Sequence, residues 1–461
     1  MLTVHGPPRR LCSGPSRRDF LRVGALGAFG LSTPLLLRAS PPGPDGFGRA
    51  RRCLLLFLTG GPPQLDTFDM KPAAPEKVRG ELRPIPTAVP GVQVSELFPL
   101  LAKRTDKVCI VRSVTHGDRA HTSAGYTMLT GVPHPKANVE SAGMAAPGPG
   151  DHPHLGALLA KVRPPGKAPT FVTLPEVIKD AGVNEFPGQT AGFLGKPYDP
   201  FRIEANPERT GLLVPDIFLP ADVTADRLAD RSALLGQLDH AADRLPSAAF
   251  EGADASARKA FEVIRSAAVR RAFALDDESA KTRERYGKHL FGQGCLLARR
   301  LLEAGVGLVT VYWHYEGPED SPVWDTHQNN FPHLRKRLAP PTDVAVSAVF
   351  DDLAARGMLA DTLLFVMGEF GRTPKINKDG GRDHWGLAQS IVLAGAGVPA
   401  GAVYGATDRD GGTPADRPVS PADLTATLMH LLGIPADLEI VDRAGRPIRA
   451  CHGSVVRGLL T

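Results

Sequence analysis

Cysteine is scarce in this sequence, and the few cysteines are far apart. The 461 residues include five, with no Cys-x-x-Cys spacing among them: Cys12, Cys53, Cys109, Cys295 and Cys451. Their number and spacing exclude a small disulfide-stapled scaffold and a cysteine-ligated zinc site. Cys53 and Cys109 lie inside short apolar runs, which favours buried free thiols over a long-range disulfide.

Outside its first residues the sequence also lacks an excess of either charge. The first 52 residues hold nine arginines and two aspartates, and the remainder carries 45 basic and 47 acidic side chains. A nearly neutral body lacks the excess of basic side chains that is typical of nucleic-acid binding, so we expect no nucleic-acid partner. The whole chain is 42% hydrophobic and 22% charged, which is typical of a globular protein with a sizeable core.

The apolar run near the start of the chain is shorter than a typical membrane-spanning helix. Val23–Leu37 spans about 15 residues, against the roughly 20 that a spanning helix needs. It follows the paired Arg17-Arg18 and a Phe-Leu dipeptide, a pattern that resembles a twin-arginine signal. We expect residues 1–39 to be that signal peptide and residues 40–52 a flexible linker. The implied partner is the twin-arginine export machinery, the implied location is the periplasm or cell envelope, and membrane contact arises only through an uncleaved leader.

The body alternates short apolar runs with amphipathic stretches. The apolar runs have no polar face, as in parallel strands covered on both sides; they are 53–59, 108–114, 171–174, 307–313, 363–367 and 391–394. The helical patterns between them are 96–104, 154–162, 344–356 and 422–432. This alternation predicts one α/β domain over 53–461 with a doubly wound, mostly parallel sheet. Residues 224–305 are almost wholly helical and charged in pattern, so we expect a helical insertion there.

In open α/β sheets ligands bind beyond the carboxyl ends of the strands, so polar residues directly after each apolar run are the first candidates. Gly60-Gly61 follows the first run and permits a tight turn with close approach of backbone to a ligand. Asp66 comes next and is a candidate metal ligand. Asp69 is equally well interpreted as the cap of a loop or helix.

The second apolar run is followed by a dense group of histidine, aspartate and hydroxyl residues. His121 is a candidate metal ligand, with His116 as a possible assistant. Thr122 is a candidate nucleophile, because a hydroxyl at a helix start has the positive dipole end and a base nearby. The alternative is that Thr122 or Ser123 is only the N-cap of that helix.

Three further groups follow later strands. Asp325 and His327, two apart in one loop, can both face a divalent cation. Glu369 stands where the chain leaves the sheet and is a candidate metal ligand, and Arg372 three residues later suits the oxyanion of a phosphate or sulfate ester.

The last of these groups is Asp383-His384, which precedes the final apolar run. Asp383 could assist catalysis or orient His384 as a ligand. Because all these groups follow strands of one sheet, we expect them to converge in a single cleft.

Four motifs together resemble a known family. They are Gly-Gly-x-x-Gln-x-Asp after the first strand, Trp-Asp-Thr-His-x-x-Asn, Gly-Glu-Phe-Gly-Arg-Thr-Pro-x-x-Asn and Gly-Arg-Asp-His-Trp. Behind a twin-arginine leader, they resemble the exported bacterial family called domain of unknown function 1501, over residues 54–432. That family is grouped with the alkaline phosphatase and sulfatase superfamily. The resemblance implies an alkaline phosphatase-like domain and a metal-dependent ester-hydrolase ancestry.

The resemblance also implies roles for individual residues. It makes Asp66 the first metal ligand, Asp325 with His327 the middle pair, and His384 the final histidine. Glu369 stands where an Asp-His pair is usual, with Phe370 in place of that histidine. Leu-Thr-Gly at 129–131 resembles the helix that follows the nucleophile, whose position falls on His121 or Thr122. No Cys-x-Pro-x-Arg string, the formylglycine signature of sulfatases, is present, so a sulfatase of the standard kind is disfavoured.

Two functions from different classes follow. The first is an exported hydrolase of a small anionic phosphate or sulfate ester that uses a divalent metal (Zn, Ca, Mg or Mn), with Thr122 or water as nucleophile. The second is a catalytically degenerate member of the superfamily that serves as a binding or assembly module.

Overall fold

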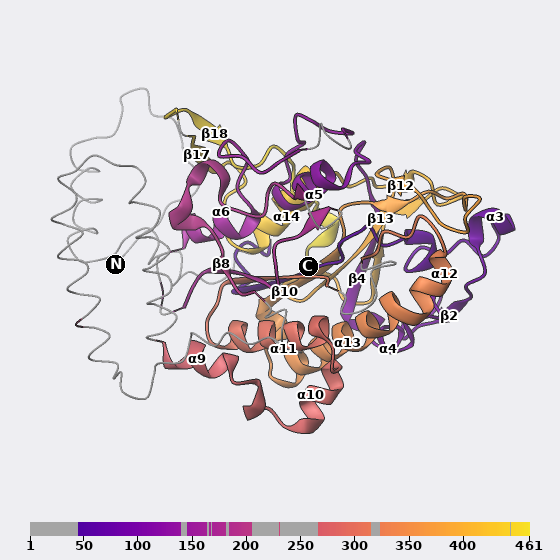
Figure 1. Cartoon of the computed structure of the whole chain (residues 1–461), viewed down its shortest axis with the longest axis horizontal. Helices are drawn as coiled ribbons and strands as arrows, with labels where there is room; N and C mark the ends of the chain where they lie inside the picture. Colours follow the sequence, from indigo (N-terminus) through magenta and orange to yellow (C-terminus); the bar gives the residue numbers. More distant parts are fainter. Residues whose placement is uncertain are drawn as a thin grey trace. The chain divides into compact units, whose positions relative to one another are not determined.

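The apolar runs of the sequence form the centre of one large sheet (Figure 1). The structure is a computed structural model that describes residues 45–139, 145–163, 166, 168–180, 184–204, 230, 266–314, 323–442 and 444–461. Within these residues the sheet has eight strands in the order β14-β4-β13-β10-β1-β9-β5-β8. Their bounds are β1 Arg52–Phe57, β4 Val108–Val114, β5 Phe171–Leu174, β8 Phe201–Arg202, β9 Leu308–Tyr312, β10 Thr362–Met367, β13 Gln389–Ala394 and β14 Ala402–Tyr404.

The sheet is mostly parallel, as predicted. Strand β1 pairs in parallel with β10 on one side and β9 on the other, and β5 is parallel to both β9 and β8. Strand β14 is likewise parallel to β4. Only β13 is reversed, antiparallel to its neighbours β10 and β4. The carboxyl ends of β1, β4, β9 and β10 therefore open onto the same edge of the sheet.

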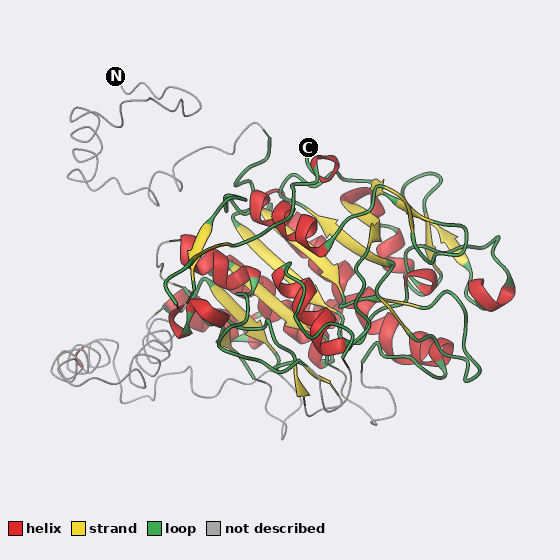
Figure 2. Cartoon of the chain, turned by 90° about the horizontal axis from the view of Figure 1, so that it is seen from above, coloured by secondary structure: helices red, strands yellow, loops and turns green. Residues whose placement is uncertain are grey.

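Helices cover both faces of the sheet, as Figures 1 and 2 show. The side chains of Cys53, Leu55 and Phe57 pack in the core beneath α5 (His121–Thr130), α6 (Leu155–Val162) and α14 (Pro421–Leu431). Leu54 and Leu56 point to the opposite core, beneath α11 (Leu290–Glu303) and α13 (Ala339–Ala355). Alternate side chains of one strand thus fill two apolar cores, which is why the run has no polar face. The doubly wound α/β fold is confirmed, and the four described cysteines are buried free thiols.

Shorter elements complete the fold. The additional helices are α3 Glu76–Arg79, α4 Pro99–Ala102, α9 Ala267–Phe273, α10 Ala280–Tyr286 and α12 Asn330–His333. Two-stranded ribbons are formed by β2 Pro84–Pro86 with β3 Gln93–Ser95, β6 Lys179–Asp180 with β7 Asn184–Glu185, β11 Gly371–Arg372 with β12 His384–Trp385, β15 Ala406–Thr407 with β16 Pro414–Asp416, and β17 Glu439–Val441 with β18 Pro447–Arg449.

Parts of the predicted organisation lie outside the described residues. These are the signal peptide (1–39), the start of the linker and most of the predicted helical insertion. From residue 45 the linker is held rather than flexible, since Gly48 N–H donates to His430 O at 2.9 Å and Ala50 N–H donates to Leu431 O at 2.8 Å. The described end of the insertion is helical (α9, α10 and α11), and α11 packs on β9 as part of the layer that covers the sheet.

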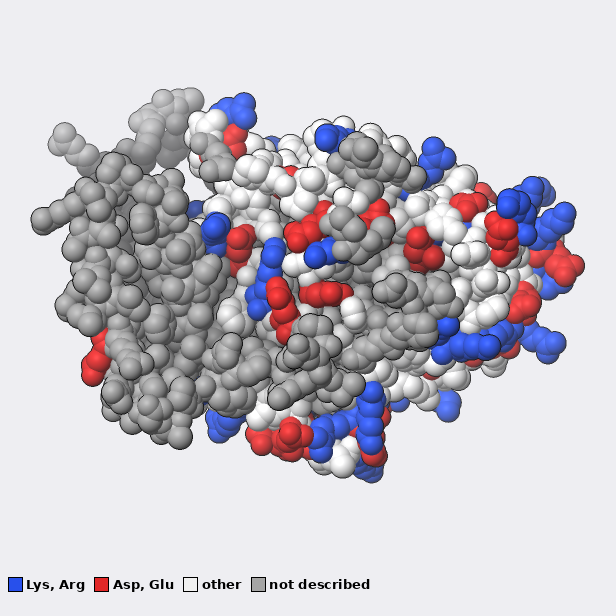
Figure 3. Space-filling model, in the orientation of Figure 1, with Lys and Arg blue, Asp and Glu red and all other residues white. Residues whose placement is uncertain are grey.

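The described surface is mixed in charge. On the face that Figure 3 shows, acidic and basic side chains of the described residues lie interspersed, with no broad area of one sign. Exposed large hydrophobic side chains in this part of the chain are Val139, Leu387 and Val441. Among the described helices, none has both the length and the apolar character that crossing a bilayer requires.

Helix α6 begins at a buried histidine whose titration links stability to pH. His154 Nδ1 accepts a hydrogen bond from Gly156 N–H at 2.9 Å, and its ring stacks on Phe171 with centroids 4.6 Å apart. Burial lowers the pKa of His154 from 6.5 to about 3. Between these values the unfolded chain binds a proton that the folded chain does not. The stabilisation is therefore complete above about pH 6.5 and is lost as the pH falls toward 3.

We expect this residue alone to lower the free energy of unfolding by about 2 kcal/mol between pH 7 and pH 5. Urea unfolding of the wild type and of His154→Asn at both pH values measures this loss. Asparagine keeps an N-cap acceptor but does not titrate. The variant should lose less stability than the wild type on acidification, and equal losses in the two proteins would contradict the prediction.

Candidate metal centre

The loops that leave β1, β4, β9 and β10 meet at the carboxyl edge of the sheet. The loop after β1 approaches the loop after β9 so closely that a Cβ at Gly60 would lie 2.4 Å from Asp325 N. Gly60 has a φ of 107°, so both its conformation and its missing side chain are needed here. Gly60 N–H also donates to Glu369 Oε1 at 2.8 Å, which ties the loop after β1 to the end of β10. Chain segments about 300 residues apart in sequence are thereby brought together.

Four side chains converge on one point at this edge. The Nε2 atoms of His121, His327 and His384 lie 3.3, 3.2 and 3.2 Å from Asp325 Oδ1. The Nε2 atoms of His327 and His384 are 2.8 Å apart. His121, Asp325 and His384 each place one ligand atom within 4.8 Å of the others, a compact group that suits a metal ion.

The other nitrogen of each ring is held by an oxygen acceptor. His121 Nδ1 contacts Glu369 Oε1 at 2.6 Å. His327 Nδ1 contacts Asp383 Oδ1 at 2.8 Å, and His384 Nδ1 contacts the backbone oxygen of Arg119 at 2.7 Å. These oxygens accept hydrogen bonds, so each Nδ1 carries a proton and each ring directs its Nε2 toward Asp325.

Three lone pairs and a carboxylate oxygen aimed at one point repel one another unless a cation or a proton lies between them. Imidazole and carboxylate ligands suit zinc and other divalent transition ions, and histidine ligands held by a second acceptor are typical of such sites. The residues present therefore fit a divalent metal ion, held by His121, Asp325 and His384 with His327 beside them.

The charges of the cluster are strongly coupled. Burial lowers the pKa of His121, but its hydrogen bonds and charge interactions with Asp325 and Glu369 outweigh burial and raise that pKa to about 10. Burial raises the pKa of Asp325, yet the nearby Arg372 and His121 hold it well below its usual range. Burial is also the main reason that the pKa of His384 is lowered. An ionised Asp325 is thus the negative centre of the group.

Two predicted residues support the cluster instead of joining it. Glu369, predicted as a ligand, uses Oε1 to hold His121 and Gly60 and is fully buried. Asp383, predicted either as catalytic or as the holder of His384, instead holds His327 and accepts a second hydrogen bond from Asn377 Nδ2 at 3.1 Å. Both carboxylates orient ring nitrogens, the role that fixes which nitrogen faces the metal.

Asp66 lies apart from the cluster, contrary to the role implied by the resemblance. Arg382 Nε donates to its Oδ2 at 2.7 Å and Arg382 Nη2 donates to its Oδ1 at 2.9 Å. Asn330 Nδ2 adds a third hydrogen bond at 2.8 Å, and both charged side chains are fully buried. Since both carboxylate oxygens are already bonded, Asp66 joins the loop after β1 to the loop before β13 and is not a metal ligand.

Arg372 is also not available to a substrate. Its fully buried guanidinium donates to Gly61 O at 3.0 Å, to Arg382 O at 3.1 Å, to Gly60 O and to Asp325 Oδ1. The sequence predicts that Arg372 binds the oxyanion of an ester. In the structure it instead holds the loop after β1 and keeps Asp325 ionised.

Thr122 follows His121 in the first turn of α5, and its hydroxyl is buried. Oγ1 has no hydrogen-bond partner among the described residues, and the side chain is fully buried. The N-cap position belongs to Ala120, so neither Thr122 nor Ser123 is the N-cap of this helix.

The remaining two candidates have structural partners. His116 Nε2 contacts Glu369 O at 2.7 Å while its Nδ1 accepts from Asp118 N–H at 3.2 Å, so neither nitrogen is left for a metal. Asp69 pairs with Lys71 Nζ at 3.0 Å and accepts a hydrogen bond from Thr407 Oγ1, so it joins neighbouring loops and lies outside the cluster.

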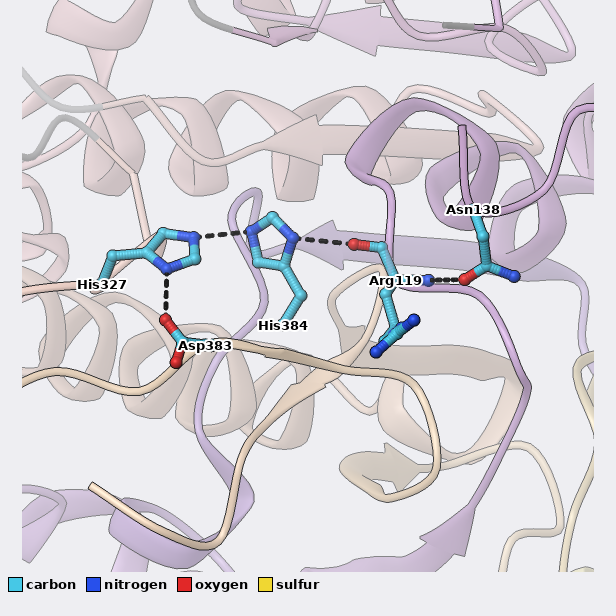
Figure 4. Close-up of a pocket in the computed structure, with 5 residues that line it drawn as sticks. All are labelled: Arg119, Asn138, His327, Asp383 and His384. Atoms are coloured by element: carbon cyan, nitrogen blue, oxygen red, sulfur yellow. Dashed lines mark hydrogen bonds and ion pairs between the residues drawn. The ribbon is translucent and has the colours of Figure 1, made fainter. Parts of the chain in front are cut away.

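An open pocket of about 430 Å³ adjoins the cluster, and Figure 4 shows the residues that line it. His327 and His384 form one side with Asp383, and Arg119 with Asn138 forms the other. Sequence reasoning missed Arg119 and Asn138. Arg119 lies within the dense group that precedes His121, but no spacing rule selects it, and Asn138 reaches the site only through the fold.

Several solved structures resemble this chain at low sequence identity. A phosphonate monoester hydrolase from Silicibacter pomeroyi is 11% identical, with a TM-score of 0.37 over 89% of this chain and 76% of that one. The PsFucS1 sulfatase from Pseudoalteromonas sp. is 13% identical, with a TM-score of 0.36 over 97% and 80%. A protein in the alkaline phosphatase superfamily from Vibrio parahaemolyticus is 12% identical, with a TM-score of 0.36 over 84% and 67%.

No curated protein matches the sequence. The match to a protein family covers nearly the whole described body, residues 50–460, and includes every side chain of the cluster. The chain belongs to the family described as protein of unknown function DUF1501.

Proposed function

We propose that this protein is a metal-dependent hydrolase of a phosphate or sulfate ester. The observation that carries the proposal is the convergence of three Nε2 atoms on Asp325 Oδ1, with each Nδ1 held by an acceptor. Nitrogen and oxygen donors gathered around one point in this way are typical of a site for a divalent cation, which would take the place of the protons that the rings otherwise carry there. The ester chemistry comes from the motif resemblance, and the open polar pocket beside the cluster gives a substrate access.

When bound, a divalent cation supplies Lewis-acid polarisation of an ester oxygen and activation of water. The protein's own residues prepare the site for it. Glu369 and Asp383 orient His121 and His327, and the backbone oxygen of Arg119 orients His384. Arg372 keeps Asp325 negatively charged, so that the oxygen is ready to bind a cation without first losing a proton.

Water is the nucleophile in this proposal. Thr122 Oγ1 is fully buried, whereas a nucleophile must reach the ester within about 3 to 3.5 Å. None of the described residues that line the pocket, Arg119, Asn138, His327, Asp383 and His384, is a serine, threonine or cysteine. Of the two nucleophiles that the sequence left open, the structure therefore favours water.

The test measures metal content and turnover together. Purified protein is equilibrated with zinc, manganese, magnesium or calcium ions, bound metal is measured by mass spectrometry, and p-nitrophenyl phosphate and p-nitrophenyl sulfate are offered as substrates. We expect about one tightly bound ion and metal-dependent release of p-nitrophenol. A wild type that retains no ion ends the proposal. An ion without turnover of any ester would favour the binding module instead.

Export by the twin-arginine machinery to the periplasm or cell envelope is part of the proposal and is supported by Arg17-Arg18 with the apolar run that follows. A protein that folds before export could load its metal in the cytoplasm, where metal availability differs. Cell fractionation of the wild type and of the double variant Arg17→Lys, Arg18→Lys measures this. Retention of the variant in the cytoplasm is the expected result, and equal export of both proteins would contradict it.

A further inference from the structure

The pocket beside the metal centre contains an arginine to which no role has been assigned. Arg119 lies on the loop between β4 and α5 and lines the pocket opposite Asp383 (Figure 4). We propose that Arg119 is the specificity-determining residue of this pocket and binds the charged oxygens of a tetrahedral oxyanion, the phosphate or sulfate group of the substrate. The inference rests on the proposed function and deepens it by assigning the recognition of the anion.

The need for such a residue follows from what Arg372 does. An anionic ester brings negative charge to a site that already holds Asp325, so a positive side chain that faces the substrate strengthens its binding. Arg372 cannot supply it, because it is fully buried and its guanidinium is bonded to backbone oxygens and to Asp325. Among the described residues that line the pocket, Arg119 is the one arginine or lysine.

The backbone of Arg119 is fixed on both sides. Its N–H donates to Asn138 Oδ1 at 2.9 Å, and its carbonyl oxygen accepts from His384 Nδ1 at 2.7 Å. The neighbouring Asp118 Oδ1 accepts from Ala120 N–H at 3.1 Å and from Asn138 N–H at 2.8 Å, which braces the same turn. Arg119 is therefore placed by the same hydrogen bond that orients a candidate metal ligand.

The guanidinium group of Arg119 has no bonding partner among the described residues. It is exposed, and it makes no hydrogen bond or ion pair with any residue in the described part of the chain. Across the pocket, Asp383 Oδ1 is bonded to His327 Nδ1 and Asn377 Nδ2 and not to Arg119. The five N–H donors of this planar fork match two oxygens of a phosphate or sulfate group.

The residues that line the pocket also indicate the chemical character of the substrate beyond its anionic group. The five described lining side chains are polar or charged, so we expect the pocket to accept an ester with a polar body. A neutral carboxylic ester would gain nothing from Arg119. The pocket is therefore expected to favour anionic esters over neutral ones.

The direct test is binding of inorganic phosphate and inorganic sulfate to the full-length protein, with its metal loaded, by isothermal titration calorimetry. We expect Arg119→Gln to weaken phosphate binding about 10- to 100-fold, because a charged hydrogen-bond donor is lost. Arg119→Lys keeps the charge without the fork and should fall between the two. Arg449→Gln removes the same charge from the exposed strand β18, outside the pocket, and should bind phosphate as the wild type does. Metal content and melting temperature are measured for every protein.

The outcomes separate this inference from the proposed function. Weaker phosphate binding by Arg119→Gln at unchanged metal content supports the inference even if no ester is hydrolysed. Equal phosphate affinity in wild type and Arg119→Gln overturns it even if esters are hydrolysed, and so does a wild type that binds neither anion in the millimolar range. Where turnover is measurable, the substitution should raise KM for p-nitrophenyl phosphate and leave KM for the neutral p-nitrophenyl acetate unchanged.

Discussion

Asp325→Asn is expected to reduce the affinity for a divalent cation more than any other single substitution at the site. Asp325 Oδ1 is the point on which three Nε2 atoms converge, and its charge is the negative centre of the group. Asparagine keeps an oxygen that can still accept from Arg372, so the loop is retained while the charge is lost. We expect the affinity to fall by more than the 10- to 100-fold that loss of a supporting hydrogen bond typically costs.

The measurement is zinc titration by calorimetry, with two reference variants. Glu369→Gln removes the carboxylate that orients His121 without removing a ligand, and should weaken zinc binding by about 10- to 100-fold. Asp410→Asn changes a carboxylate on an exposed loop outside the cluster and should have no effect. If Asp325→Asn binds zinc as tightly as Asp410→Asn does, the four converging atoms are not a metal site.

The second large effect is on stability and comes from Asp66. Asp66→Asn should lower the free energy of unfolding by about 3 to 5 kcal/mol, because it leaves the buried guanidinium of Arg382 without its countercharge. Urea unfolding followed by circular dichroism measures the change. Asp416→Asn, which alters an exposed ion pair with Arg417, should change stability by only about 0.5 kcal/mol or less.

The same variant distinguishes the two roles assigned to Asp66. A ligand, as the family resemblance implies, would lower metal affinity when it is replaced. A buried ion-pair partner, as the structure has it, lowers stability while the folded fraction still binds metal. Replacing both partners, as Asp66→Leu with Arg382→Met, should recover part of the lost stability, since no uncompensated charge remains. Full stability of Asp66→Asn with loss of metal would reverse the assignment.

The candidate cluster could be predicted in part because its members lie next to apolar strands in the sequence. Asp325, His327 and His384 each follow or precede an apolar strand, and parallel strands place such positions at one edge. Proximity in space therefore followed from the order of strands and loops. What each residue does once it is there depends on its neighbours across the sheet, which no local pattern contains.

Arg372 and Asp66 illustrate the limit. Both occupy positions that face the active edge by sequence, and both carry a charge that suits catalysis. Arg372 is buried because Gly60 and Gly61 let the first loop lie against it, and Asp66 is bonded because Arg382, 316 residues later, reaches it. Glu369 orients a ring of the cluster through Oε1, which is bonded to Gly60 N–H and His121 Nδ1, while its buried Oε2 has no partner among the described residues.

By itself, the sequence determined the alternation of strands and helices, the two-sided burial of the strands and the edge at which polar groups gather. These depend on side-chain periodicity over a few residues, and periodicity is a local property of the chain. Only the tertiary structure decided which polar groups face an open pocket and which are hydrogen-bonded to buried partners. That choice depends on hydrogen bonds between residues about 50 to 320 positions apart, whose distances are set by the packing of the whole sheet and not by any segment of it.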